Sequence, residues 1–376
     1  MPISAESAVF LACHRLAEAM LPPHRLRLLL EASGGNPEAA LGQTLGLTTA
    51  QQSRLERASQ AVVPTSLLDQ AQTLGIQAFL TTDPDYPAEL RHFDDSPAIL
   101  FVRGHLPTVL GLAIVGSRRA TLYGKAQAGR FARAFAEAGF SVVSGGAAGV
   151  DTAAHRGTLE AGGTTVAVVA CGLDYVYPAE NRSLFEQIVA KGGAIVSEFP
   201  VGTKPEPWRF PARNRIIAAL SQATLVIESP EQSGALITAR NAAEYGRDVW
   251  VVPGPVDTGR SRGGHKLVQD GASLADCPED ILEVLAASPQ RVNLTRPVNL
   301  MLPLEVEVNV PEPKKPLPEL LPDEAVLFEQ LSGTPVSLDD AAEAAALAPA
   351  QAMVAATMLE MKGLIQRQPG NQFRRS

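Results

Sequence analysis

Two glycine-bearing loops offer the strongest chemical signal in this chain of 376 residues. Each follows a short apolar stretch and opens a stretch with helical periodicity. Glycines let backbone N–H groups approach an anion closely, and a helix N-terminus adds a favourable dipole. Close strand–helix packing also needs glycine, so it is the two loops together with an arginine pair that predict a phosphodiester or nucleotide site. The residues are Gly116, Ser117, Arg118 and Arg119 in the first loop, and Ser144, Gly145 and Gly146 in the second.

A third cluster surrounds Phe210 with cationic and amide side chains. Such a mixture suits single-stranded nucleic acid, because cations bind phosphates and an aromatic ring stacks on a base. The alternative is a solvated helix start with Phe210 in the core. The members are Lys204, Arg209, Phe210, Arg213, Asn214 and Arg215.

Two carboxylates and one histidine could take part in acid–base chemistry, but each also has a structural alternative. Glu198 and Glu228 follow apolar stretches, where they could serve as general acid or base or could hold neighbouring arginines in place. His155 lies four residues after Asp151, a spacing that permits a catalytic dyad, but we expect a local hydrogen bond instead.

Several catalytic motifs are absent from the sequence. Gly259 and Gly264 have the spacing of a P-loop, but His265 follows where lysine is required, which excludes a P-loop ATPase. There is no HExxH, no GxSxG and no histidine pair at metal-binding spacing. We therefore expect no catalytic residues, no metal and no cofactor.

Composition indicates a soluble protein of the cytoplasm. Hydrophobic residues make up 45% of the chain, enough for two or three domains. The net charge of −8 excludes a uniformly basic nucleic-acid coat but allows a local basic patch. Cys13, Cys171 and Cys277 lie far apart, which excludes a disulfide framework and fits a reducing compartment. The sequence has no secretory signal and no long apolar run, so we expect no membrane segment.

Short apolar stretches alternate with amphipathic ones between residues 79 and 288. Continuously apolar strands are typical of a parallel sheet covered on both faces, and repeated strand–helix units predict a doubly wound, Rossmann-like α/β fold. Such sheets bind ligands at the carboxyl ends of their strands, where both glycine loops lie. The expected strands are 112–115, 141–143, 166–170, 194–196, 224–227 and 249–252, and the expected helices are 124–138, 150–161, 181–190, 212–220 and 234–245.

Two further pieces precede and follow this domain. Residues 1–78 have helical periodicity with glycine-bearing turns, which predicts a small bundle of sterile-alpha-motif or helix-hairpin-helix type. Thr48 or Thr49 is expected to cap a helix over 50–61. We favour a structural appendage over a nucleic-acid or partner module. Residues 289–320 contain seven prolines without helical period and predict an extended linker.

Residues 321–376 follow the order of a winged helix. Helices are expected over 323–331, 338–346 and 349–361, followed by a β-hairpin. Many winged helices bind DNA through the third helix. Here Lys362 is the one cation of that helix, so we favour a protein contact over a major-groove contact.

Between residues 85 and 282 the sequence resembles the DNA-processing protein A (DprA/Smf) family. The resemblance covers over half the chain, and its motifs are jointly very specific. They are Asp85–Pro87, Leu100–Gly104, Val115–Arg118, Ser144–Asp151, Cys171–Asp174, Tyr177–Asn181, Phe210–Ala218, Ser233–Ala239, Gly246–Arg247, Val252–Pro255, Gly271–Ala272 and Pro278–Leu282.

The resemblance implies a non-catalytic role in natural transformation. Such proteins bind incoming single-stranded DNA, protect it from nucleases and load the RecA recombinase onto it, often displacing single-strand-binding protein. They also form homodimers. In this chain the DNA would lie over both glycine loops and the segment 210–213, with Ser233 and Gly234 beside it. The dimer and RecA contacts would fall on Ala243, Val268, Gln269 and Leu274.

The chain departs from the family pattern at a few positions. Ala235 replaces a usual serine and so lacks its hydroxyl donor. Pro207 stands where some relatives have a basic residue, so Lys204 or Arg209 must supply that charge.

Two other functions fit parts of the pattern and are less favoured. Nucleotide phosphoribohydrolases share the fold, glycine-rich loops and a strand-end glutamate, but their Pro-Gly-Gly-x-Gly-Thr-x-x-Glu loop is missing at 229–238. A transcription factor that binds duplex DNA would need a basic recognition helix, which the winged helix lacks.

Overall fold

The computed structural model describes residues 5–287, 320–331, 336–345, 347–362, 364–368 and 372–375. The chain divides into two compact units, Met1–Leu300 and Met301–Ser376. The predicted linker over 289–320 lies outside the described residues except for Leu320. The predicted domain boundaries at 78, 288 and 320 stay predictions.

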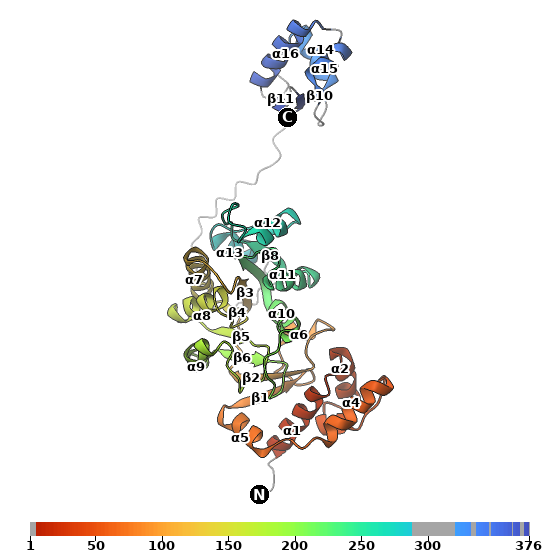
Figure 1. Cartoon of the computed structure of the whole chain (residues 1–376), viewed down its shortest axis with the longest axis vertical. Helices are drawn as coiled ribbons and strands as arrows, with labels where there is room; N and C mark the ends of the chain where they lie inside the picture. The colour runs from red at the N-terminus through yellow and green to blue at the C-terminus, as the bar shows by residue number, and fades with distance from the viewer. Residues whose placement is uncertain are drawn as a thin grey trace. The chain divides into compact units, whose positions relative to one another are not determined.

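A nine-stranded sheet forms the centre of the larger unit, in the order β1-β2-β6-β5-β4-β3-β7-β8-β9 (Figure 1). Strands β3 to β9 are parallel, which confirms the Rossmann-like class. The sheet is nevertheless mixed, because β1 pairs antiparallel with β2, and β2 pairs antiparallel with β6. The strands are β1 (Ile76–Leu80), β2 (Ile99–Gly104), β3 (Gly111–Gly116), β4 (Ser141–Ser144), β5 (Thr165–Val168), β6 (Ala194–Ser197), β7 (Ser221–Ile227), β8 (Asp248–Val251) and β9 (Ser273–Leu274).

Helices cover both faces of this sheet. Leu112 of β3 packs in one hydrophobic cluster with Phe131 of α7, whereas the next residue, Ala113, packs in another with Ile216 of α10. Burial of both faces explains why the strands are continuously apolar. The helices are α6 (Ala88–Arg91), α7 (Leu122–Glu137), α8 (Val150–Glu160), α9 (Arg182–Ala190), α10 (Arg209–Ala219), α11 (Ala235–Glu244), α12 (Arg262–Gln269) and α13 (Glu279–Ala286), with a 3₁₀ turn at Ala179–Asn181.

The sheet grows in opposite directions from β3. Strands β4, β5 and β6 lie on one side of it, and β7, β8 and β9 lie on the other. The connections at the carboxyl ends of β3 and β7 therefore diverge, and this topological switch point is where α/β sheets bind ligands.

Five helices at the N-terminus pack against the β1–β2 end of the sheet (Figure 1). Leu16 and Leu29 share a hydrophobic cluster with Phe101 of β2. Thr48 caps α4 in a capping box with Gln51, which confirms one of the two predicted caps. The helices are α1 (Ala5–Glu18), α2 (Pro23–Ala32), α3 (Pro37–Leu41), α4 (Thr49–Gln60) and α5 (Thr65–Thr73).

The smaller unit confirms the predicted winged helix. Three helices are followed by a hairpin, and a short additional strand, β10, completes a three-stranded antiparallel sheet in the order β10-β12-β11. Leu327, Leu338, Leu359 and Phe373 form the centre of its hydrophobic core. The elements are α14 (Pro322–Gln330), β10 (Val336–Ser337), α15 (Leu338–Ala344), α16 (Pro349–Met361), β11 (Ile365–Gln368) and β12 (Gln372–Arg375).

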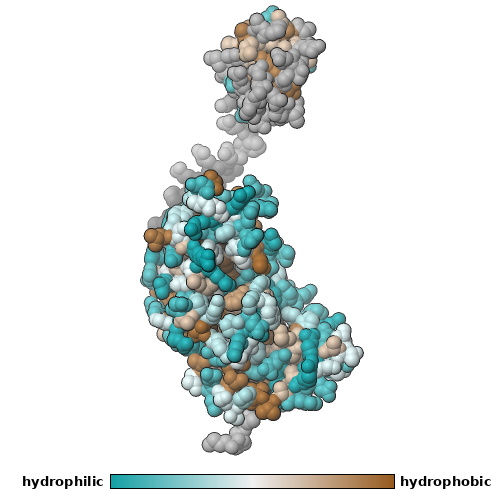
Figure 2. All heavy atoms as spheres, viewed as in Figure 1, coloured by the Kyte–Doolittle hydropathy of each residue, from teal (hydrophilic) through white to brown (hydrophobic). Residues whose placement is uncertain are grey.

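The surface of the larger unit is mainly hydrophilic on the face that Figure 2 shows, with hydrophobic residues in small separate groups. Within the described ranges, no helix has the length and apolarity needed to cross a membrane.

Candidate nucleic-acid interface

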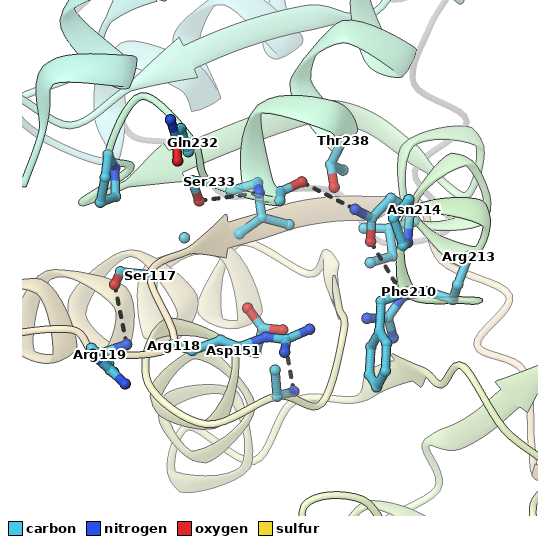
Figure 3. A pocket seen from close by; sticks show the side chains of 18 of the residues that line it. Ser117, Arg118, Arg119, Asp151, Phe210, Arg213, Asn214, Gln232, Ser233 and Thr238 are labelled. Carbon is cyan, nitrogen blue, oxygen red and sulfur yellow. Dashed lines mark hydrogen bonds between the residues drawn. The ribbon is translucent and has the colours of Figure 1, made fainter. Parts of the chain in front are cut away.

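A cavity of about 710 Å³ opens at the switch point, between the carboxyl ends of β3 and β7. We call it the switch-point pocket. Figure 3 shows the turn after β3 on one side, the start of α10 on another and the loop after β7 on a third. Nine of the predicted binding residues line this cavity: Gly116, Ser117, Arg118, Arg119, Phe210, Arg213, Asn214, Ser233 and Gly234.

The turn between β3 and α7 is fixed by side chains at both of its ends. Ser117 Oγ accepts a hydrogen bond from the backbone N–H of Arg119 at 3.1 Å. Thr121 caps α7, and both its N–H and its hydroxyl donate to the carboxylate of Glu228 at the end of β7. Glu228 itself has a positive φ of 46°, a conformation that non-glycine residues rarely adopt. The turn therefore depends on a contact with the neighbouring strand.

Three exposed arginines gather at this side of the pocket. The guanidinium of Arg118 lies 4.7 Å from the ring centroid of Phe210, a cation–π contact. Arg260, from the loop after β8, donates to the backbone carbonyl of Arg119 at 3.3 Å. Tyr177 lies on a further side of Phe210, with the ring centroids 5.5 Å apart. The pocket thus offers cations for phosphates beside a partly exposed aromatic ring.

The loop between β4 and α8 begins with buried residues whose carbonyl groups bond to side chains of the protein. Ser144, Gly145 and Gly146 are all buried. Arg213 donates to the carbonyl of Gly145 at 2.7 Å, and Asn181 donates to the carbonyl of Gly146 at 2.9 Å. None of the three lines the cavity, but Arg213, which does line it, bonds to Gly145, and we call these three residues the floor of the site. The carbonyl groups of Gly145 and Gly146 are already bonded within the protein.

Two buried charges stabilise this floor. Asp151 accepts a hydrogen bond from the N–H of Ala147 at 3.2 Å and lies near Arg213. A Cβ atom at Gly145 would come within 2.6 Å of the Asp151 carboxylate and 2.7 Å of the Arg213 guanidinium, so a larger residue there would displace these two buried side chains. Burial raises the pKa of Asp151, and the charge of Arg213 opposes that effect. Burial also lowers the pKa of Arg213 to about 10, which leaves it charged at neutral pH.

The third side of the pocket is polar and uncharged. Asn214 donates to the carbonyl of Gly234 at 3.0 Å, which ties α10 to the loop before α11. Ser233 Oγ accepts from the N–H of Ala235 at 3.2 Å. Both side chains face the cavity in Figure 3.

The structure separates two predicted cations from this pocket. Arg215 forms a two-point ion pair with Glu198, with both N–O distances at 2.7 Å. Burial lowers the pKa of Arg215, but the hydrogen bonds to Glu198 and the nearby negative charges of Glu198 and Asp95 together give a net increase. Lys204 lines a different cavity, next to the N-terminal helices. Of the two roles left open for Glu198, the structure supports the one of holding an arginine.

The expected local hydrogen bond of His155 is present, but its partner is not Asp151. Thr165 donates its hydroxyl hydrogen to the carbonyl of Val142, so His155 Nδ1 donates to Thr165 Oγ1, at 2.7 Å. The other ring nitrogen, Nε2, is buried without a hydrogen-bond partner. Burial lowers the pKa of His155 to about 3, helped by the charge of Arg213. The ring is therefore neutral under physiological conditions.

Sequence reasoning assigned no binding role to several residues that line the pocket, among them Arg260, Tyr177, Gln232 and Thr238. Arg260 lies in the loop after β8, whose strand was predicted, so the strand-end rule applied to this loop could have found it. Tyr177 lies between β5 and α9 in a segment with no periodicity. It belongs to the family motif Tyr177–Asn181, but residue type and spacing alone give it no binding role.

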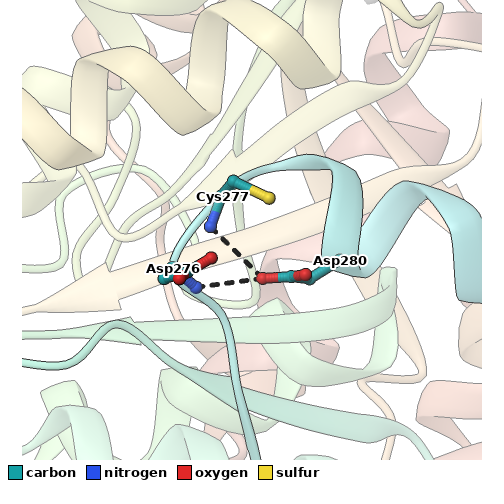
Figure 4. A group of neighbouring side chains, drawn as sticks. All are labelled: Asp276, Cys277 and Asp280. Atoms are coloured by element: carbon teal, nitrogen blue, oxygen red, sulfur yellow. Dashed lines mark hydrogen bonds between the residues drawn. The ribbon is translucent and has the colours of Figure 1, made fainter.

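One cluster of potential metal ligands occurs in the part of the chain that the structure describes, formed by Asp276, Cys277 and Asp280 (Figure 4). The Asp280 carboxylate accepts hydrogen bonds from the backbone N–H groups of Asp276 and Cys277, at 3.0 and 3.2 Å. These bonds lower the pKa of Asp280 and fix the chain at the start of α13. The Asp280 carboxylate is therefore engaged in holding the segment that leads into α13.

The predicted contact residues Ala243, Val268, Gln269 and Leu274 lie on α11, α12 and β9. β9 is the last strand of the sheet, and Leu274 is 50% exposed there. Ala243 and Gln269 are also exposed, whereas Val268 is partly buried against the core.

Known families and proteins match this chain over most of its length. A family model described as DNA recombination-mediator protein A matches residues 77–286, and one described as the DprA winged helix domain matches residues 311–371. Protein Smf from Synechocystis is 35% identical over 367 residues, which covers 92% of each chain.

Two solved structures are also similar. DNA processing protein A from Streptococcus pneumoniae is 32% identical with a TM-score of 0.61, and the match covers 72% of this chain and 95% of that one. DNA processing protein A from Helicobacter pylori, described for its single-stranded DNA binding mode, is 29% identical with a TM-score of 0.50. That match covers 57% of this chain and 96% of the other.

Proposed function

The chain belongs to the DNA recombination-mediator protein A (DprA/Smf) family, and from that premise we propose that it binds single-stranded DNA during natural transformation. In this proposal it protects the incoming strand from nucleases and loads the RecA recombinase onto it, in the cytoplasm. The observation that carries the proposal is the switch-point pocket, which is lined by three exposed arginines and by Phe210, with Arg118 against the Phe210 ring.

Local charge explains how an acidic protein could hold a polyanion. The chain carries a net charge of −8, but charges farther apart than about 8–10 Å are largely screened at physiological salt. A strand in the pocket would therefore interact mainly with Arg118, Arg119 and Arg260. Such a site binds phosphates and stacks on bases without contacting base edges, so its binding does not depend on the DNA sequence.

The remaining predicted residues have supporting positions around these arginines. Asn214, Ser233 and Gly234 would border the strand on the uncharged side. We propose that Ser144, Gly145 and Gly146 shape the floor, and that Arg213 acts through them as well as through its charge.

We propose that the protein is not an enzyme and needs no cofactor. The groups that the sequence offered for acid–base chemistry are engaged elsewhere: Glu198 with Arg215, Glu228 with Thr121, and His155 with Thr165. Release of a base from a nucleoside monophosphate would instead favour the phosphoribohydrolase alternative.

A second copy of the chain and RecA are the proposed protein partners, with single-strand-binding protein as a competitor on the DNA. The exposed edge strand β9 and the exposed residues Ala243, Gln269 and Leu274 support an interface on this side. Replacing Val268 or Leu274 by arginine should give a folded monomer in analytical ultracentrifugation that still binds a short oligonucleotide. If the Leu274→Arg variant stays folded and dimeric, the interface lies elsewhere.

The flanking domains have distinct proposed roles. Met353, Val354 and Met358 of α16 are 41%, 64% and 38% exposed, which supports a protein contact for the winged helix. The domain division proposed from the sequence, at residues 78, 288 and 320, assigns DNA binding to the central part.

The proposal is tested by fluorescence anisotropy of labelled oligonucleotides across a salt series. Each phosphate contact contributes about 0.7 to the slope of log K against log salt on single strands, or roughly fourfold in affinity at 0.15 M relative to 1 M salt. The Arg118→Ala, Arg119→Ala double variant should therefore bind more than about tenfold more weakly, for every sequence alike.

A matched control removes two arginines that do not line the pocket. Arg133 and Arg156 are exposed on α7 and α8. Their double alanine variant should keep wild-type affinity and slope. Equal affinities for the two double variants would overturn the proposed site, as would tighter binding of duplex than of single-stranded oligonucleotides.

A further inference from the structure

A second cavity, of about 680 Å³, lies between the N-terminal helices α1 and α4 and the segment that connects β6 to α10. We call it the helical groove. Arg54 and Arg57 of α4 line one side of it, and Lys204 lines the other. Arg57 and Lys204 are exposed, and Arg54 is partly exposed. Two elements that are distant in sequence therefore direct cations into one groove.

Two carboxylates, Glu18 and Glu206, and four cations line this groove, so positive charge is in excess. Glu206 lies 3.5 Å from Arg209 and accepts a hydrogen bond from the Trp208 indole at 2.6 Å. Glu18 lies 4.0 Å from the ring of His14 on its own helix. Arg54 and Arg57 each donate one hydrogen bond to a backbone carbonyl, of Met20 and Ser53, and a guanidinium has five N–H donors. Donors therefore remain for an anion.

A short ridge separates the helical groove from the switch-point pocket. Pro207 and Phe210 line the pocket, whereas Glu206 and Arg209 line the groove. Because consecutive Cα atoms are only about 3.8 Å apart, the two cavities are adjacent across these residues. The middle of the ridge is Trp208, which is 48% exposed.

The ridge is built so that an aromatic ring stays at the surface. The guanidinium of Arg209 lies 4.7 Å from the ring centroid of Trp208 and 5.3 Å from that of Phe199. The side chain of Arg209 is 12% exposed, so it positions the rings rather than offering its charge to solvent. An exposed ring between two groups of cations is what successive nucleotides of a single strand require, since bases stack and phosphates need positive charge.

We propose that the helical groove is a second binding site for the same single strand, which leaves the switch-point pocket, passes over Trp208 and continues between Lys204 and the arginines of α4. This inference rests on the proposed function and gives the N-terminal helices a part in DNA binding, contrary to the structural appendage expected from sequence. It also accounts for Lys204, which lies outside the first pocket.

The test compares two lengths of oligothymidylate on the full chain. Single-strand modules contact about 4–16 nucleotides, so a strand of about 6 should fit the switch-point pocket alone and one of about 20 should reach both sites. The Arg54→Gln, Arg57→Gln double variant should bind the short strand as the wild type does and the long strand roughly tenfold more weakly. Its salt slope on the long strand should fall by about 1.4, for two phosphate contacts.

Two further variants complete the experiment. Trp208→Ala should weaken the long strand without changing the salt slope, because stacking releases no counterions. The Arg133→Gln, Arg156→Gln variant removes the same charge from helices that do not line the groove, and should match the wild type at both lengths. Circular dichroism should show native folding for each.

The outcomes separate this inference from the proposed function. If the short strand requires Arg118 and Arg119 but the α4 variant binds the long strand like the control, the helical groove is not a DNA site and the first site stands. If the wild type binds neither strand, the proposed function fails. Binding of an acidic peptide to the groove, without any loss for the long strand in the α4 variant, would likewise overturn the inference.

Discussion

The turn after β3 and the loop after β4 both bring glycines to the start of a helix, but their surroundings differ. In the turn, Arg118 and Arg119 are exposed and face the pocket. In the loop, the carbonyls of Gly145 and Gly146 are bonded to side chains and the backbone is buried. The two are also connected, because the N–H of Val150 donates to the carbonyl of Ser117 at 3.2 Å. A glycine pattern alone therefore does not distinguish a loop that binds a ligand from a buried loop that supports it.

The largest expected effect is a loss of folding stability when Asp151 is replaced. Replacing Asp151 by alanine leaves the buried Arg213 without a neighbouring carboxylate, and removal of one partner of a buried charge pair costs about 3–5 kcal/mol. Urea denaturation should therefore give a markedly lower free energy of unfolding. Asp257→Ala, at an exposed position, should change it by no more than about 0.5 kcal/mol. A loss below about 1 kcal/mol at Asp151 would mean that the loop is not the structural support described above.

Acid should weaken the same region through His155. Its pKa in the folded state is about 3, below the value of about 6.5 in an unfolded chain. The unfolded state therefore binds a proton first, and the stabilising contribution is complete above about pH 6.5 and is lost as the pH falls towards 3. Between pH 7 and pH 5 this contribution should fall by about 2 kcal/mol.

The matched histidine for this measurement is His105, which is exposed. His155→Gln should make the free energy of unfolding less dependent on pH between 7 and 5, and His105→Gln should leave that dependence as in the wild type. An unchanged pH dependence in the His155 variant would show that the buried ring does not link protonation to unfolding.

The smallest expected effect concerns the open side of the pocket. Phe210→Ala should weaken single-strand binding by about 1 kcal/mol, at the lower end of the range for stacking, because Arg118 already lies near the ring and must move for a base. The slope of log K against log salt should stay the same. Phe210→Tyr retains a ring and should bind like the wild type. A change of slope in the alanine variant would assign Phe210 to the positioning of Arg118.

The parallel strands were predictable from the sequence because burial on both faces makes them continuously apolar. The strand predicted over 112–115 is observed as Gly111–Gly116, and the one over 249–252 as Asp248–Val251. Strands β1 and β2 were not predicted. Within the described residues, strand β1 pairs only with β2, and the antiparallel pairing of β2 with β6, such as Phe101 opposite Ser197, depends on a partner nearly a hundred residues away rather than on local pattern.

The site was predictable in its loops and less so in its helix. Residues two positions apart on a helix point about 200° apart, so Arg213 and Arg215 cannot both face the pocket. The structure directs Arg213 to Gly145 and Arg215 to Glu198. In the sequence the two arginines look equivalent, because the sequence does not show how α10 is rotated about its axis.

The tie between Thr121 and Glu228 affects how quickly a strand can bind. A turn that is already held in one conformation loses little conformational entropy when a ligand arrives, so more of the interaction energy remains as affinity. Association then need not wait for a loop to close, and its rate is governed by diffusion and by the electrostatic attraction of the exposed arginines. We therefore expect rapid capture of a strand, with the lifetime of the complex set by how many of its nucleotides are in contact.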